Sequence, residues 1–219
     1  MINNYPIVNI YEKNSLKSKL SSQLIYGEKF QILNKKKDWL KIKTSYDNYI
    51  GFIKKRKFLR SSKITHKVSS LSANLYSRPE EKFILITKLP FCSKISVSEI
   101  NKKFYKFENY WIKKENVVPL SYKQKIFKDI KMFKNIAYKW GGKTFRGIDC
   151  SALVQLFFKF NNLYCPRDTK EQIKYFRKAK RIKKNSIIFW KGHVAICLSK
   201  NILIHAYGPK KKVLVMNIK

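Results

Sequence analysis

The sequence predicts a multidomain α+β protein in which two small all-β modules precede a mixed domain of helices and strands. Three observations predict this class. Short apolar runs separated by turn residues fill residues 22–59, a pattern typical of a small β-barrel. The same pattern returns more faintly across residues 64–120. From Cys150 onward the apolar spacing becomes that of a helix, and three short apolar strands follow it.

The first module is assigned to residues 1–60. Its strands are read from apolar or aromatic runs that end at glycine, aspartate or lysine-rich turns. The predicted strands lie at 24–28, 30–33, 39–43 and 49–53.

The second module is assigned to residues 64–120, after a linker at 61–63. Its predicted strands lie at 67–68, 74–76, 89–91, 96–97, 104–106 and 110–112. A boundary at 118–121 opens the third domain, residues 121–219. Apolar residues at helical spacing predict that an amphipathic helix over 123–139 begins this domain.

One cysteine of the third domain has the setting of a nucleophile. Cys150 follows the glycine-containing stretches 141–142 and 147, and Leu153, Leu156, Phe157 and Phe160 continue from it at helical spacing. The thiol therefore lies at or just before a helix N-terminus. Backbone N–H groups and the helix dipole there favour an anion, so we expect a lowered thiol pKa.

Two histidines follow the predicted helix on predicted strands. His193 opens a strand over 193–198, and His205 lies in the next strand, 202–206. A three-residue loop at 199–201 would make these strands a hairpin, with His205 across from His193. Such a pair could supply the base that a thiol needs and the group that orients the base.

The motifs Tyr138-Lys-Trp-Gly-Gly, Gly147-Ile-Asp-Cys-Ser, Gly192-His-Val-Ala-Ile and Leu203-Ile-His-Ala resemble the NlpC/P60 family of papain-like cysteine peptidases, which cut peptidoglycan stem peptides. The resemblance implies a papain-like catalytic domain. It assigns Cys150 as nucleophile, His193 as base and His205 as the residue that orients His193. It implies no metal and no organic cofactor.

Residues 22–59 resemble a bacterial SH3 domain through Tyr26-Gly-Glu, Trp39 and Asp47-x-Tyr-x-Gly-Phe, and the second module resembles a diverged copy. Two SH3-like barrels before an NlpC/P60 domain are similar to the γ-D-glutamyl-L-diamino acid endopeptidases. That resemblance implies cleavage of the γ-D-Glu–diamino acid bond in murein peptides with a free N-terminal L-Ala. Glu28 would hold the ammonium and Tyr49 would make a second contact; alternatively they are a turn residue and a core aromatic.

Other motif positions carry implied substrate contacts. Tyr138 matches a tyrosine that can bind the oxyanion, and Asp149 and Ser151 flank the nucleophile. The run Arg167-Asp168-Thr169 matches a segment of the cleft wall, with threonine where the family usually has serine. Two further departures are Ala152 in place of glycine and Phe52 in place of tryptophan. The alternative interpretation makes Tyr138 a core ring and Asp149 a helix N-cap.

The formal charge of +36 comes from 49 basic and 13 acidic residues. Nucleic acid is the first partner that such a charge suggests. However, 42 of the basic residues are lysine and 7 are arginine, and they are scattered along the chain. We interpret this as a compositional bias of the coding sequence and expect no nucleic-acid partner. An anionic wall fragment would still be attracted.

The remaining features concern compartment and assembly. Four cysteines without paired spacing predict neither disulfides nor a zinc site, and Cys92, Cys165 and Cys197 are interpreted as small buried hydrophobes. We see no signal peptide and no apolar run long enough to span a membrane. We therefore expect a cytoplasmic monomer that recycles murein peptides. The alternatives are a secreted or general peptidoglycan hydrolase and a non-catalytic SH3 protein that binds wall peptides.

Overall fold

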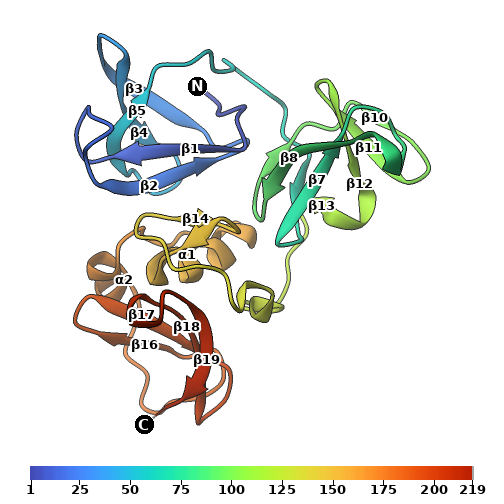
Figure 1. Ribbon diagram of the computed structural model, residues 1–219. Coiled ribbons are helices and arrows are strands. Elements are labelled where there is room, and N and C mark those ends of the chain that lie inside the picture. The colour runs from blue at the N-terminus through green and yellow to red at the C-terminus, as the bar shows by residue number, and fades with distance from the viewer. Residues whose placement is uncertain (219) are drawn as a thin grey trace. The chain divides into compact units, whose positions relative to one another are not determined.

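The computed structural model describes residues 1–218 and divides into two compact units, residues 1–122 and 123–219 (Figure 1). Each unit has its own sheets. The predicted division into three domains, at 1–60, 64–120 and 121–219, stays a prediction.

The first part of unit 1 is a five-stranded antiparallel sheet in the order β2-β1-β5-β4-β3. Its strands are β1 Ile7–Tyr11, β2 Leu20–Ile25, β3 Phe30–Lys36, β4 Trp39–Thr44 and β5 Ile50–Lys54. Alternate residues of these strands face a core that contains Ile10, Leu24, Phe30, Ile42 and Ile53. Four of the strands overlap predicted segments; β1 had not been predicted.

The second part of unit 1 contains a five-stranded sheet, β10-β11-β12-β7-β8, and a three-stranded one, β13-β6-β9. The strands are β6 His66–Val68, β7 Ser72–Tyr76, β8 Ile84–Pro90, β9 Lys94–Ile95, β10 Glu99–Ile100, β11 Phe104–Phe107, β12 Tyr110–Lys113 and β13 Val117–Pro119. Short 3-10 turns lie at Glu81–Phe83 and Lys114–Asn116. Within the described residues the sheets of both parts are open rather than closed by hydrogen bonds, which differs from the expected barrels.

The turn between β2 and β3 joins the two parts of unit 1. Tyr26 lies in the hydrophobic core of the second part, and its carbonyl accepts a hydrogen bond from the backbone N–H of Lys94 at 2.9 Å. Gly27 has a φ of 79°, and a Cβ there would lie 2.1 Å from the Lys94 carbonyl oxygen. Glycine is therefore required by both conformation and space.

Unit 2 is built on a four-stranded antiparallel sheet in sequential order, β16-β17-β18-β19 (Figure 1). Its strands are β16 Ile187–Trp190, β17 His193–Cys197, β18 Ile202–Tyr207 and β19 Lys212–Asn217, and a short hairpin comprises β14 Lys143–Thr144 and β15 Gly147–Ile148. The helices are α1 Cys150–Phe160 and α2 Thr169–Tyr175, with 3-10 turns at Ile130–Phe133 and Gly208–Lys210. Helix α1 packs against β17 and β18, and its apolar side chains are buried except for Phe158, which is partly exposed.

The predicted helix over 123–139 is wrong. This segment contains only the 3-10 turn Ile130–Phe133, and Phe127, Asp129 and Asn135 all have positive φ. Non-glycine residues in the left-handed region interrupt a right-handed helix. The apolar residues that suggested a helix still reach the core, because the Phe127 and Phe133 rings lie 5.9 and 6.0 Å from that of Phe157 on α1.

Candidate active site

Cys150 is the first residue of α1, and the turn before it is held by glycine and by a cap. Asp149 is the N-cap, and its carboxylate accepts the backbone N–H of Ala152 at 2.8 Å. Gly147 has a φ of 139°, and a Cβ there would lie 2.6 Å from Cβ of Lys139. The prediction that Cys150 begins a helix is therefore confirmed by the structure.

The thiol lies beside β17, in a mostly buried position. Its Sγ is 3.9 Å from Oγ1 of Thr169, and the backbone of Val194 is within hydrogen-bonding reach of it. Cys150 is 6% exposed. Since Val194 follows His193 directly, the packing of α1 on β17 brings the thiol to the start of the histidine-bearing strand.

The electrostatics of the thiol differ from the expectation. Burial raises the pKa of Cys150 above its usual value, and the negative charge of Asp149 raises it further. Hydrogen bonds from Val194, Thr169 and Ser151 lower the pKa by less. The expected lowering at the helix N-terminus is wrong, because desolvation of a thiolate outweighs the donors around it.

His193 and His205 form a direct pair. Nε2 of His193 lies 2.8 Å from Nδ1 of His205, and the ring centroids are 5.0 Å apart. The loop between the strands comprises the four residues 198–201 instead of the expected three, and the register pairs Ile196 with Ile204. Continued along the strands, it places Ala195 opposite His205, so the two imidazoles meet diagonally on one face rather than directly across. The predicted pairing of His193 with His205 is therefore wrong: the residue opposite His205 is Ala195, two positions after His193.

Both imidazoles are held neutral. Burial lowers the pKa of His193, and burial together with the neighbouring His193 lowers the pKa of His205 to about 4. If Nε2–H of His193 donates to Nδ1 of His205, then Nδ1 of His193 is left to accept a proton. Within the described residues, Nε2 of His205 is buried and has no hydrogen-bond partner. The Tyr207 ring stacks on His205 at 4.7 Å and restricts its rotation.

A second polar cluster involves the two residues that flank the nucleophile in sequence. Arg167 forms a bidentate ion pair with Asp149, at 3.0 and 2.6 Å, and also donates to Oγ of Ser151 at 2.9 Å. The backbone N–H of Gly141 donates to the same carboxylate at 2.9 Å. All three side chains are buried. The structure therefore brings these predicted substrate contacts together as an internal scaffold for the start of α1.

The predicted residues Asp168 and Thr169 begin α2. Asp168 is its exposed N-terminal flanking residue, and its carbonyl accepts the backbone N–H groups of Glu171 and Gln172. Gln172 was missed by the sequence analysis. Its amide donates to the carbonyls of Ser151 and Pro166, both at 2.9 Å, so it ties α2 to the nucleophile turn. Only its fully buried position on a short, largely exposed helix distinguishes it.

Tyr138 lies close enough to Cys150 and Asp149 to sense their charges. Burial, followed by those two negative charges, raises the pKa of Tyr138 to about 12. Its hydroxyl therefore stays protonated and can donate a hydrogen bond. The ring packs beside Gly208, where a Cβ would lie 3.6 Å from ring carbons. This placement is compatible with both a packing role and a role in oxyanion binding.

Trp190 was also missed. It pairs with His193 across β16 and β17, and the two rings lie 5.8 Å apart. The indole is 46% exposed, so it offers an apolar surface directly beside the imidazole. The available sequence signal was a tryptophan two residues before the Gly-His motif.

The two predicted contacts of unit 1 lie within its first part. Glu28 is buried, and its Oε2 accepts the backbone N–H of Ile25 at 2.9 Å. Tyr49 packs against the first core, and its hydroxyl donates to the carbonyl of Ser21 at 3.5 Å. These contacts fit the structural alternative; a contact with substrate stays a prediction.

The other three cysteines differ from Cys150. Cys92, Cys165 and Cys197 are free thiols, and each is no more than 2% exposed. Residues 1–218 hold no group of three histidine, cysteine, aspartate or glutamate residues that could bind a metal ion. No helix among these residues is long and apolar enough to cross a membrane.

Comparison with known proteins finds two family models that match parts of the chain. The model of the NlpC/P60 family matches residues 135–219, and that of the bacterial dipeptidyl-peptidase SH3 domain matches residues 10–58. The protein carries an NlpC/P60 domain behind a bacterial SH3 domain. By family, the NlpC/P60 domain is a cysteine peptidase.

Several known proteins match this chain along most of their own length. Dipeptidyl-peptidase 6 of Lysinibacillus sphaericus is 23% identical over 91% of this chain and 84% of its own. A γ-D-glutamyl-L-lysine dipeptidyl-peptidase of Bacillus cereus is 23% identical over 90% of this chain and 70% of its own. The crystal structure of an NlpC/P60 family protein from B. cereus matches 99% of this chain and 93% of its own, with a TM-score of 0.87 at 17% identity. That likeness shows the fold.

Proposed function

We propose that this protein hydrolyses the γ-D-Glu–diamino acid bond of murein stem peptides that carry a free N-terminal L-Ala. The observation that carries the proposal is the buried thiol of Cys150 at the start of α1, beside the strand that bears the 2.8 Å His193–His205 pair. The names of the relatives, dipeptidyl-peptidase 6 and γ-D-glutamyl-L-lysine dipeptidyl-peptidase, support this substrate class.

The reaction uses the three groups in sequence. Nδ1 of His193 takes the proton of Cys150 while Sγ attacks the γ-carbonyl of D-Glu. The backbone N–H of Cys150, which has no intrahelical acceptor, and the hydroxyl of Tyr138 donate to the oxyanion. The imidazolium then protonates the leaving amine of the diamino acid. Water, activated by the same imidazole, hydrolyses the thioester and restores the thiol.

His205 keeps His193 in the productive orientation through the Nε2–Nδ1 contact. Because the pKa of His205 is lowered to about 4, it remains a neutral acceptor when His193 becomes an imidazolium. A neutral orienting group is compatible with papain-like catalysis, in which an amide can fill this place.

The SH3 domain provides the selectivity in this proposal. Glu28 would bind the ammonium of L-Ala and thereby restrict the enzyme to peptides already released from the glycan. We assign residues 64–120 to a second, diverged SH3-like domain, supported by its five-stranded antiparallel sheet. The physiological role would be the recycling of wall peptides by a cytoplasmic monomer.

The test compares two tripeptides, L-Ala-γ-D-Glu-meso-diaminopimelate and its N-acetylated form, with products identified by mass spectrometry. We expect the wild type to release diaminopimelate from the free peptide and Cys150→Ala to release none. A broken ammonium–carboxylate pair costs roughly 2–5 kcal/mol, so acetylation should lower kcat/KM about 30-fold to several-thousand-fold. Glu28→Gln should reduce the difference in kcat/KM between the free and the acetylated peptide. Glu12→Gln should not reduce it, because Glu12 is an exposed carboxylate just after the β1 strand. Equal cleavage of both peptides by the wild type would favour a general wall hydrolase.

A further inference from the structure

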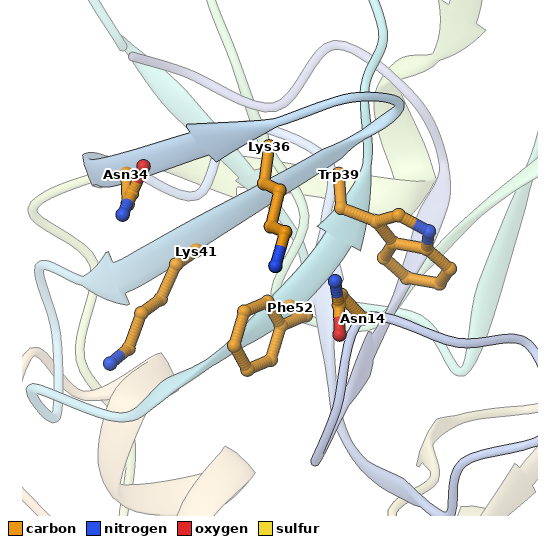
Figure 2. A pocket seen from close by; sticks show the side chains of 6 residues that line it. All are labelled: Asn14, Asn34, Lys36, Trp39, Lys41 and Phe52. Atoms are coloured by element: carbon orange, nitrogen blue, oxygen red, sulfur yellow. The ribbon is translucent and has the colours of Figure 1, made fainter.

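The first sheet of unit 1 has a pocket on the face that is turned away from its core. Leu40 and Ile42 of β4 and Ile53 of β5 point into the core, so their neighbours in sequence point to the other face. On that face is a cavity of about 270 Å³ (Figure 2). Six side chains line it: Asn14, Asn34, Lys36, Trp39, Lys41 and Phe52.

A β-bulge in β3 directs two polar side chains to this face. The register of β3 with β4 shifts between Ile32 and Asn34, which leaves Leu33 as the extra residue. As a result Asn34 pairs with Lys41 and projects to the outer face. Without the extra residue the end of β3 would present the opposite set of side chains.

Five of the six lining side chains lie on strands and are ordered by cross-strand pairing, whereas Asn14 comes from the loop between β1 and β2. Two rows run across β3, β4 and β5: Asn34–Lys41–Phe52 and Lys36–Trp39–Lys54. Side chains opposite each other on one face of an antiparallel sheet lie in contact distance. Each row therefore places an aromatic ring beside a lysine on a rigid element.

The floor of the pocket is aromatic. The Trp39 ring meets the edge of Tyr11 at 5.7 Å and 87°, and Nζ of Lys54 lies 5.0 Å from its centroid. Trp39 is buried, with 8% exposure, and Phe52 is half-buried; neither ring belongs to the hydrophobic cluster around Ile10 and Ile42 on the opposite face of the sheet. Packing in that cluster therefore does not account for the two large rings on this face.

The rim is cationic and amidic. The lining includes Lys36 and Lys41, the amides of Asn14 and Asn34, and no acidic residue. Asp38, in the turn between β3 and β4, is paired with Lys54 at 3.8 Å and is well exposed. The pocket thus offers ammonium and amide groups around a ring surface, the complement of an anionic ligand with an apolar face.

We propose that this pocket binds an acidic sugar, a pyranose ring that carries a carboxylate. The C–H face of the ring would stack on Trp39 and Phe52, the amides would bond its hydroxyl and acetamido groups, and Lys36 and Lys41 would hold the carboxylate. A peptide strand is disfavoured, because the site lies on the face of the sheet and offers no unpaired backbone edge. The choice of a wall sugar as the natural source rests on the proposed function.

The experiment titrates the full-length protein and follows the indole N–H signal of Trp39 in 1H–15N spectra, assigned with Trp39→Phe. The probes are N-acetylmuramic acid, N-acetylglucosamine, the dipeptide L-Ala-γ-D-Glu and a short single-stranded oligothymidylate. The two sugars differ only by the lactyl ether at O3, which adds the carboxylate and a methyl group and replaces a hydroxyl. We expect saturable binding of N-acetylmuramic acid, and binding of N-acetylglucosamine at least about fivefold weaker, as expected for a partly exposed charge contact.

Lys36→Gln and Lys41→Gln should each weaken the binding of N-acetylmuramic acid about three- to tenfold and leave that of N-acetylglucosamine unchanged. Lys35→Gln is the matched control, because Lys35 is an exposed neighbour on β3 outside the lining. Tripeptide cleavage should be unchanged in all three variants, so this result is independent of the peptidase test.

Three results would overturn the proposal: equal affinity for the two sugars, an equal loss in Lys35→Gln, or tighter binding of the dipeptide or the oligothymidylate than of the acidic sugar. The second would indicate general attraction to a basic surface. Binding of N-acetylmuramic acid by a protein that fails to cut the tripeptide would support the pocket and reject only the peptidase substrate.

Discussion

The two polar clusters beside Cys150 differ in how completely their members are bonded. In the Asp149–Ser151–Arg167 cluster, the carboxylate receives both arms of a guanidinium and two backbone N–H groups. In the His193–His205 pair, the imidazoles bond each other, and Nε2 of His205 is buried without a hydrogen-bond partner among the described residues.

This difference separates scaffolding from chemistry. A buried ion pair with its lone pairs satisfied is rigid, and breaking it leaves an uncompensated charge. A neutral imidazole with a lowered pKa is kept ready to accept a proton, at the cost of an unsatisfied buried group. We therefore expect mutations in the Asp149–Ser151–Arg167 cluster to act mainly on stability, and mutations in the His193–His205 pair to act mainly on turnover.

The largest expected effect is on turnover. His193→Ala should lower kcat/KM for the free tripeptide by about 10⁴-fold or more, since nucleophile and base act as one unit. The melting temperature should change little. His66→Ala is the matched control, because His66 lies on β6 in unit 1. A fully active His193→Ala would end the assignment of the base.

The next effect is on stability. Asp149→Asn preserves shape but leaves Arg167 as a buried, unpaired cation, so we expect a loss of about 3–5 kcal/mol in the free energy of unfolding of unit 2. Denaturant titration measures it. Asp168→Asn, at the exposed start of α2, should cost far less. Should the two variants unfold at the same midpoint, the Asp149–Arg167 pair would not be a scaffold.

The sequence predicted the His193–His205 pair better than the Asp149–Ser151–Arg167 cluster. The histidines lie on adjacent strands with a short loop, so hairpin geometry alone brings them together, apart from the two-residue register correction. Asp149 and Arg167 are 18 residues apart on elements whose packing no local pattern specifies. Their motif positions suggested substrate contacts, whereas burial shows that they bond each other.

The incorrect prediction of a helix over 123–139 has a related cause. Apolar spacing identified the buried residues of that segment, including Ile130 and Phe133, but not the path between them. Phe127 and Asp129 have positive φ values, and the Phe127 ring packs against Phe157 of α1; side-chain periodicity encodes neither feature. Strands 39–43 and 49–53 were found because alternation records directly which face is buried.

A smaller effect is expected at the orienting residue. His205→Asn retains an acceptor for Nε2–H of His193, so kcat/KM should fall about ten- to a hundredfold, less than for His193→Ala. His205→Leu, which has no acceptor, should lose more activity at similar stability. Equal activity of the Asn and Leu variants would show that His205 only fills space.

The smallest expected effect is the change of activity with pH near neutrality. Burial keeps the pKa of His193 below 6.5, so its neutral, proton-accepting form is already at least about half populated at pH 6.5. Raising the pH to 7.5 can then increase kcat/KM no more than about twofold, while the L-Ala ammonium stays mostly protonated.

The same site should show a steep pH dependence in another assay, the alkylation of its thiol. Because the pKa of Cys150 is raised, its thiolate forms only at alkaline pH, and alkylation by iodoacetamide should accelerate about tenfold per unit between pH 7 and 8. Cys150→Ala provides the background from the other three thiols. An alkylation rate that stays constant from pH 5 to 8 would instead indicate a preformed thiolate–imidazolium pair, and the contrast between a charged scaffold and a neutral catalytic pair would fail.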